Sequence, residues 1–432
     1  MTVHAPIIPD QARGRTPHPV VYTILIIPFG ATSGYVTVAM AYLATQNKLS
    51  VEEGAALAAV SLLPQTWKFL WAPVVDLTLT RKRWYVIAAA LCAAGAVAMS
   101  AIPLQRGRLT ELNTAIVLAS VASTFLGMAV EGLIAHATPP EQRGRVGGWF
   151  QAGNLGGTGL GGGAGLFMAI HLPAPWMSGA VLGAVFLAGC AALLFVPEPK
   201  DPVHDGAMGR PAIERVLGAI GALAKDLWTT VVSRTGFVCA VLCILPIGAG
   251  AASTVLAESD VAKVWGVGPD TVASVNGVMN GLISAAGCLV GGEICARMSS
   301  RKAYALFGLF MAAVAAGMAI APYQPWSYVA FILAYAFATG LCYAAFTGFV
   351  LEAIGKGAAA TKYNAFASLS NTPIMYMTIV LARAFAYFET SGPAVQAKGM
   401  LLTEAAAGVA GVVVLVVVVG GANAMFRGRA RR

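Results

Sequence analysis

The chain has 432 residues, of which 58% are hydrophobic and only 11% are charged. An ordinary soluble domain carries about a quarter charged residues, and disordered chains are rich in charge, so both classes are excluded. The 28 Lys and Arg residues outnumber the 19 Asp and Glu residues, which gives a net charge of +9. A membrane protein with several spans remains, and the positions of its basic residues decide whether this charge signals nucleic-acid binding or orientation.

Long apolar runs recur along the whole sequence. A bilayer core about 30 Å thick needs about 20 apolar residues per spanning helix. The runs are continuous and lack the alternation of a membrane β-strand. We therefore predict an all-α membrane protein with twelve spans, at roughly 20–45, 54–79, 84–103, 113–137, 146–170, 175–196, 235–257, 269–296, 303–321, 326–352, 363–387 and 400–425.

The basic residues separate by side of the predicted membrane. Twenty-one of them lie in the termini or in loops on the same side as the termini, five lie in the opposite loops, and Lys68 and Arg383 lie within spans. The positive-inside rule therefore places both termini in the cytoplasm. The net charge is then an orientation signal, and no nucleic-acid partner is expected. Residues 1–19 lack the hydrophobic region of a secretory signal.

The two halves of the chain repeat each other at offsets of 218 to 221 residues. The matched features are Ile26–Ala31 with Ile244–Ala249, Arg81-Lys82 with Arg301-Lys302, Pro103 with Pro322, and Glu131 with Glu352. This order predicts a duplicated six-helix unit. We expect an N-terminal bundle over 1–196, a cytoplasmic linker with an amphipathic helix over 197–234, and a C-terminal bundle over 235–432.

Ionisable residues within spans are costly, so each is a candidate for function. Gln65, Lys68 and Asp76 share one face of the second predicted span, with Trp71 beside them. Lys68 could bind an anionic substrate group, pair with a buried carboxylate or extend to the membrane surface. Glu131 in the fourth span could carry protons in coupled transport, or form an ion pair that gates the cytoplasmic end.

Further polar residues within the spans extend the candidate site. Glu352, near the cytoplasmic end of the tenth span, is interpreted as a gating residue. Arg383 could bind an anion, pair with Glu389 or extend to the membrane surface. The remaining candidates for a polar substrate cavity are asparagines, which also form hydrogen bonds between helices: Asn154, Asn276, Asn280 and Asn371.

Several other patterns argue against enzymatic or cofactor chemistry. The run Gly156–Gly165 contains G-x-G-x-x-G, but it lies inside a predicted helix, where small residues allow close helix packing. The seven cysteines fall within spans and lack metal-site spacing with histidines, so no metal or cofactor is expected. The sequence has no nucleophile–base pair and no ATP-binding P-loop. We therefore predict that the protein is not an enzyme.

One stretch resembles a known transporter branch. Gln65–Asp76, followed by Arg81–Trp84, resembles the K-F-L-W-A-P-x-x-D…R-R-x-W stretch of AmpG-type muropeptide permeases. These belong to the major facilitator superfamily, and acetyl-CoA transporters and siderophore-uptake permeases share the branch. Ala360–Phe366 and the loop Pro139–Arg145 are similar to the corresponding segments of that group.

The resemblance implies a fold, a gate and a function. The superfamily fold has two six-helix bundles, and its helix 2–3 signature would make Asp76 and Arg81 hold the halves in one state. The copy of this signature in the second half of the chain, around Arg297, has Ala296 where the acidic residue would be. This departure weakens the case for an equivalent gate in the second half. The implied function is that of a monomeric secondary active transporter in the bacterial inner membrane. It would import a polar or anionic small molecule with protons, of the muropeptide, siderophore or acyl-CoA class.

Two other functions remain open from the sequence. One is efflux of a drug or metabolite, because no motif encodes direction. The other is a non-transporting membrane assembly factor on the same fold. Such a factor would not need Lys68 or Glu131, so silent substitutions at these positions would favour it.

Overall fold

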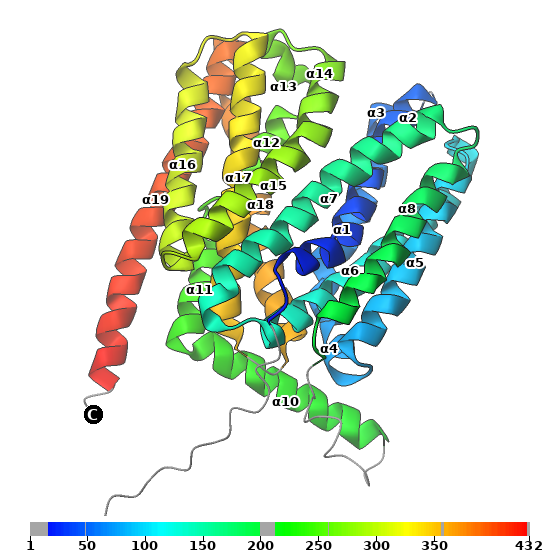
Figure 1. Ribbon diagram of the computed structural model, residues 1–432. Coiled ribbons are helices and arrows are strands. Elements are labelled where there is room, and N and C mark those ends of the chain that lie inside the picture. Colours follow the sequence, from blue (N-terminus) through cyan, green and yellow to red (C-terminus); the bar gives the residue numbers. More distant parts are fainter. Residues whose placement is uncertain (1–15, 48, 199–211, 258, 356–357, 430–432) are drawn as a thin grey trace, which may run out of the picture.

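The computed structural model describes residues 16–47, 49–198, 212–257, 259–355 and 358–429, and it places them in two bundles of helices joined by a helical linker (Figure 1). The first bundle contains α1 (Val20–Gly34), η1 (Tyr35–Met40), α2 (Ala41–Gln46), α3 (Val51–Trp67), η2 (Lys68–Leu70), α4 (Ala72–Leu77), α5 (Arg81–Ala101), η3 (Arg106–Arg108), α6 (Leu109–Ala137), η4 (Pro140–Gln142), α7 (Arg143–His171), α8 (Trp176–Gly189) and η5 (Cys190–Phe195).

The second bundle follows the linker helix α10 (Ala212–Val232). It contains α11 (Arg234–Ile244), α12 (Ala251–Leu256), α13 (Ser259–Ala262), η6 (Lys263–Trp265), α14 (Pro269–Ser274), η7 (Val275–Met279), α15 (Asn280–Cys295), α16 (Ser300–Ile320), α17 (Pro325–Ile354), α18 (Ala359–Tyr387), η8 (Glu389–Ser391) and α19 (Pro393–Arg429).

The number of spans agrees with the sequence prediction. Among the described residues, nine helices are long and apolar enough to cross a membrane on their own. Three further predicted spans complete the twelve: the glycine-rich α7, and two spans that the structure breaks, α3–η2–α4 and α11–α12. The fold is therefore an all-α membrane protein with twelve spans in two six-helix bundles.

Two of the predicted spans, 54–79 and 235–257, are broken in the structure. The first changes to a 3₁₀ turn at Lys68–Leu70, four residues after Pro64, and Pro73 lies in the first turn of α4. The second ends at Ile244 and resumes at Ala251, with Pro246 in the gap. Gly248 and Gly250 have φ of 64° and 63° there, a left-handed backbone that favours glycine. Missing proline N–H groups and these glycines explain both breaks.

Glycines of α7 bring three helices into close contact. On one face, Gly157 and Gly161 lie against the backbone of Ile27 and Ala31 in α1. On another face, Gly159 lies against Gly281 in α15, where a Cβ on Gly281 would come within 2.5 Å of the Gly159 backbone. The glycine run therefore packs helices, as predicted, and α7 joins the first bundle to the second.

The linker helix α10 lies across one end of the molecule. It turns by 82° into α11 and contacts α4 of the first bundle and α18 of the second (Figure 1). It is 21 residues long and lies within the segment 197–234. Among its apolar residues at helical spacing, Leu223 is buried and Leu227 is half-buried, and the side chains of Val216 and Ile220 lie outside the described residues. We refer to this end of the molecule as the α10 side.

Candidate functional site

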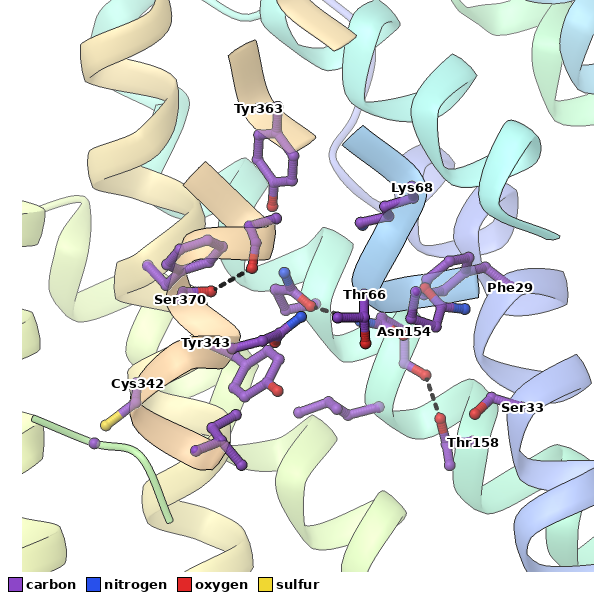
Figure 2. A pocket seen from close by; sticks show the side chains of 18 of the residues that line it. Phe29, Ser33, Thr66, Lys68, Asn154, Thr158, Cys342, Tyr343, Tyr363 and Ser370 are labelled. Atoms are coloured by element: carbon purple, nitrogen blue, oxygen red, sulfur yellow. Dashed lines mark hydrogen bonds between the residues drawn. The ribbon is translucent and has the colours of Figure 1, made fainter. Parts of the chain in front are cut away.

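A central cavity of about 550 Å³ lies between the two bundles, and both bundles line it (Figure 2). This volume lies within the range of small-molecule sites. Its first-bundle lining includes Phe29, Ser33, Gln65, Thr66, Lys68, Glu131, Phe150, Gln151, Asn154 and Thr158. Its second-bundle lining includes Gly248, Ala249, Tyr304, Cys342, Tyr343, Phe346, Tyr363, Ser370, Asn371 and Pro373.

Lys68 reaches this cavity because the second span breaks at that residue. The side chain is buried, with its Nζ 3.7 Å from Oε1 of Glu131 and 5.7 Å from the ring centroid of Phe29. The carboxylate supplies a counter-charge, and the aromatic face adds a weaker attraction for a cation. Of the uses proposed for Lys68, the structure therefore shows pairing with a carboxylate at the cavity wall.

Glu131 joins the two bundles through its second oxygen. Its Oε2 accepts a hydrogen bond of 2.6 Å from Nδ2 of Asn364 in α18. The same Nδ2 donates to the carbonyl oxygen of Ala360 at 2.8 Å. Only 4% of Glu131 is exposed, so both interactions act in a setting with little water.

Asp76 makes the second contact between the bundles on the same turn of α18. Its Oδ2 accepts hydrogen bonds of 2.8 Å from the backbone N–H and from the hydroxyl of Thr361, and its Oδ1 lies 3.4 Å from the N of Ala360. Arg81 Nη2 lies 3.5 Å from the same Oδ1. A carboxylate at the start of a helix satisfies N–H groups that have no partner within the helix.

A chain of amide and hydroxyl groups crosses the cavity wall beside Glu131. Asn154 donates to Gln151 at 2.9 Å, and Gln151 donates to the hydroxyl of Thr347 at 2.8 Å. The Thr347 hydroxyl is 3.0 Å from that of Tyr363. Gln151 belongs to α7 and Thr347 to α17, so this chain also connects the bundles.

Two ion pairs reinforce the α10 side. Arg145 holds Glu293 across the bundle interface through Nε at 2.7 Å and Nη2 at 2.9 Å, and both side chains are about half exposed. Lys362, which is buried, places its Nζ 3.0 Å from Oδ2 of Asp226 in α10. The linker helix thus contacts the turn of α18 that also carries the Asp76 and Glu131 contacts.

The structure brings part of the predicted site together at the cavity. The members that line it are Gln65, Lys68, Glu131, Asn154 and Asn371. The other predicted binding residues do not belong to the described lining: Trp71, Asn276, Asn280 and Arg383.

Three of these four residues make hydrogen bonds away from the cavity, and the fourth is exposed. The Trp71 indole donates to the Thr124 hydroxyl at 2.9 Å, and Asn276 donates to the Tyr328 hydroxyl at 3.1 Å. Asn280 accepts from Ser284 one helical turn away, at 3.3 Å. Arg383 is exposed on α18, and the side chain of Glu389 lies outside the described residues.

The remaining predicted gating residues lie on the α10 side of the second bundle. Glu352 accepts a hydrogen bond of 3.0 Å from Ser300, and its Oε2 lies 3.7 Å from Nε of Arg301. Arg297 is exposed. Glu352 therefore contacts its own bundle in this conformation, unlike Asp76 and Glu131.

Sequence reasoning missed residues that connect the bundles, and one residue that holds the broken span of the second bundle. Thr361 and Asn364 lie in the Ala360–Phe366 segment that we matched to a family pattern, but no role was assigned to them. Glu404 in α19 is an ionisable residue within a predicted span and was overlooked. It is 6% exposed, and its Oε2 accepts a hydrogen bond of 2.7 Å from the N of Ala252, at the broken span. Its acidic character within an apolar run was the available signal.

The described residues contain no group of three or more His, Cys, Asp or Glu side chains that could hold a metal ion. A helical membrane protein with a polar cavity between two bundles, and with hydrogen bonds and an ion pair between those bundles, has the architecture of a transporter. A sequence profile of the Major Facilitator Superfamily matches residues 22–372. The chain belongs to this family of membrane transporters, and it is not an enzyme.

Solved structures agree with this fold. The proton:xylose symporter XylE bound to 6-bromo-6-deoxy-D-glucose has a TM-score of 0.62 and 15% identity to the chain, over 91% of this chain and 94% of that one. A double-tryptophan mutant of XylE gives the same score and coverage at 17% identity. At these identities the likeness concerns the fold. No protein in a search of curated sequences matches the chain.

Proposed function

We propose that the protein is a secondary active transporter that imports a polar or anionic small molecule together with protons, by alternating access of the central cavity. The observation that carries this proposal is the buried Lys68–Glu131 pair at the cavity wall, held to the second bundle by Asn364. A carboxylate in a cavity within the membrane is suited to bind and release a proton. XylE, which has the same fold, is described as a proton symporter.

The coupling is carried by one turn of α18. Glu131 contacts Asn364, and Asp76 contacts Thr361, so the proton site and the gate lie three residues apart on this helix. Asn364 also holds the Ala360 carbonyl. A change at Glu131 therefore acts on the segment that closes the α10 side.

The membrane orientation follows from the charges. Arg81–Arg83, Arg143, Arg145, Arg301 and Lys302 all belong to the α10 side. The positive-inside rule makes this side cytoplasmic. The resemblance to AmpG-type permeases supports the bacterial inner membrane as the location. The contacts between the bundles on that side then correspond to a state closed toward the cytoplasm. Import is favoured as the direction of transport, because the transporter branch that the sequence resembles contains uptake permeases.

The substrate class is tested with purified full-length protein. Muropeptides, siderophores and acyl-CoA are each added, and the unfolding midpoint is recorded, since a ligand that binds only the folded state raises it. A ligand that binds is then offered to proteoliposomes with an inward proton gradient. Accumulation above equilibrium is expected. If none of the three classes binds, these substrate classes are wrong. If a ligand that binds equilibrates without regard to the gradient, the proposed proton-coupled transport itself is wrong.

A further inference from the structure

The charges of the cavity wall are paired. Among the described lining residues, Lys68 is the one cation and Glu131 the one carboxylate, and they face each other at 3.7 Å. Their side chains are 10% and 5% exposed. Because Glu131 neutralises Lys68, an anion that enters the cavity competes with this carboxylate for the ammonium group.

Glu131 keeps a second anchor that does not depend on Lys68. Nδ2 of Asn364 donates to its Oε2 at 2.6 Å. Oδ1 of Asn364 is buried and has no hydrogen-bond partner within the described parts of the chain. When Glu131 is protonated, its carbonyl oxygen can still accept the hydrogen bond from Nδ2 of Asn364. The site therefore accommodates a protonated Glu131 while Lys68 is released.

The other charged and titratable side chains near Glu131 have partners of their own. On the elements packed against it, these groups are Asp76 in α4, Arg81 in α5, and Lys362 and Tyr363 in α18. Asp76 and Arg81 pair with each other, and Nζ of Lys362 pairs with Asp226. The Tyr363 hydroxyl contacts Thr347. Lys68 is thus the cation positioned to take a substrate anion.

The wall facing Lys68 is aromatic. Tyr304, Tyr343, Phe346 and Tyr363 line the cavity from the second bundle. Figure 2 shows Lys68 and Phe29 on one side of the cavity, and Tyr343 and Tyr363 on the other. Aromatic faces favour apolar or planar groups, with hydroxyls available at their edges. A ligand that spans the cavity would meet a cation at one end and an aromatic surface at the other.

We propose that the substrate is an amphiphilic acid with one negative charge, whose acid group replaces Glu131 as the partner of Lys68 when Glu131 takes up a proton. This inference rests on the proposed function. One proton enters with each monoanion, so the transported unit carries no net charge. The apolar part of the substrate packs on the Tyr343 and Phe346 wall.

The test uses two aryl acids, 2-naphthoate and 3-phenylpropanoate, each paired with its uncharged primary amide. Binding to the purified full chain is measured between pH 6 and 8, where both acids stay ionised. For the wild type we expect the Kd of each acid to decrease by up to tenfold when the pH is lowered by one unit. The Kd of each amide should stay constant, because only acid binding takes up a proton. If acids and amides bind alike, if acid binding ignores pH, or if neither acid binds, the proposal is wrong.

Three variants assign the effect to the pair. Glu131→Gln should bind the acids tightly at every pH, because Lys68 lacks its competitor. Lys68→Gln should lose the preference for acid over amide. Lys302→Gln, which changes an exposed lysine on the α10 side, should behave as the wild type. Acid binding by Glu131→Gln that still follows pH, or acid preference retained in Lys68→Gln, would overturn the assignment.

Uptake in proteoliposomes separates this inference from the proposed function. A proton gradient alone should drive uptake of the acids, and a membrane potential alone should not, because no net charge moves. If a membrane potential also drives uptake, the electroneutral entry of one proton with each monoanion is wrong, but proton coupling stands. If neither gradient drives uptake of a ligand that binds, proton coupling itself is wrong.

Discussion

Asp76 and Thr361 are 285 residues apart in sequence and meet across the interface between the two bundles. The Asp76 carboxylate accepts both the backbone N–H and the hydroxyl of Thr361 at 2.8 Å. Both residues are about 8% exposed. This contact ties the end of the second span to the start of α18, and it closes the α10 side of the cavity.

Replacing the Asp76 carboxylate should open that side. Asp76→Asn keeps the shape but removes the charge that pairs with Arg81 and strengthens the bonds to Thr361. Hydrogen bonds to charged groups contribute about 1.5–3 kcal/mol each, so we expect a roughly ten- to hundredfold shift away from the closed state. Spin labels at Glu141→Cys and Lys302→Cys, both exposed on the α10 side, report the separation of the bundles. An unchanged distance distribution would remove Asp76 from the gate.

The hydroxyl of Thr361 offers a finer test of the same contact. Thr361→Val removes one of the two close donors to Asp76 and leaves the backbone N–H in place. We expect the closed state to lose about 1–2 kcal/mol, measured by the same spin-label distances. Thr361→Ser keeps the hydroxyl and should restore the wild-type distribution. If Val and Ser behave alike, side-chain bonding is not what holds the gate.

The Arg145–Glu293 pair should matter less, although its geometry is bidentate. Its side chains are 48% and 43% exposed, so water and salt screen the attraction. Exposed ion pairs contribute about 0.2–1 kcal/mol. A double-mutant cycle with Arg145→Gln and Glu293→Gln, read from the free energy of unfolding in detergent, should give a coupling in this range that declines with salt. A coupling of several kcal/mol at high salt would contradict this.

Close packing between the bundles predicts a difference between two glycines. Gly281→Ala places a methyl group within 2.5 Å of the Gly159 backbone, and the packed helices must separate to admit it. We expect a lower unfolding midpoint. Gly218→Ala in α10 meets nothing within 4 Å, so it should leave the midpoint unchanged or raise it through helix propensity. Equal midpoints for the two variants would mean that the α7–α15 contact does not limit stability.

The sequence predicted the spans because bilayer burial imposes a strong local signal. Twenty apolar residues in a row suffice to identify a span. The breaks at Lys68 and Ile244 could not be distinguished from mere bends at the prolines of these spans, since proline and glycine are common in intact membrane helices as well. Whether a span bends or breaks depends on the partners of its backbone groups, and those are set by tertiary contacts.

The site was partly predictable for the same reason. Lys68 and Glu131 stood out because charge within a span is costly, and the structure places them 3.7 Å apart. Their pairing could not be deduced, because nothing in the sequence says which faces of the second and fourth spans meet. Asn276 and Asn154 are both asparagines within apolar spans and look alike in the sequence, yet of the two only Asn154 lines the cavity. Helix rotation within the bundle decides between such residues.

Glu131→Gln tests the central claim most directly. The variant and its control, Glu141→Gln on an exposed turn, are reconstituted with a ligand that the wild type accumulates. Two rates are compared: accumulation driven by an inward proton gradient, and exchange of labelled for unlabelled ligand without a gradient. The account predicts that Glu131→Gln loses accumulation and keeps exchange, while Glu141→Gln keeps both. Undiminished accumulation by Glu131→Gln would contradict it.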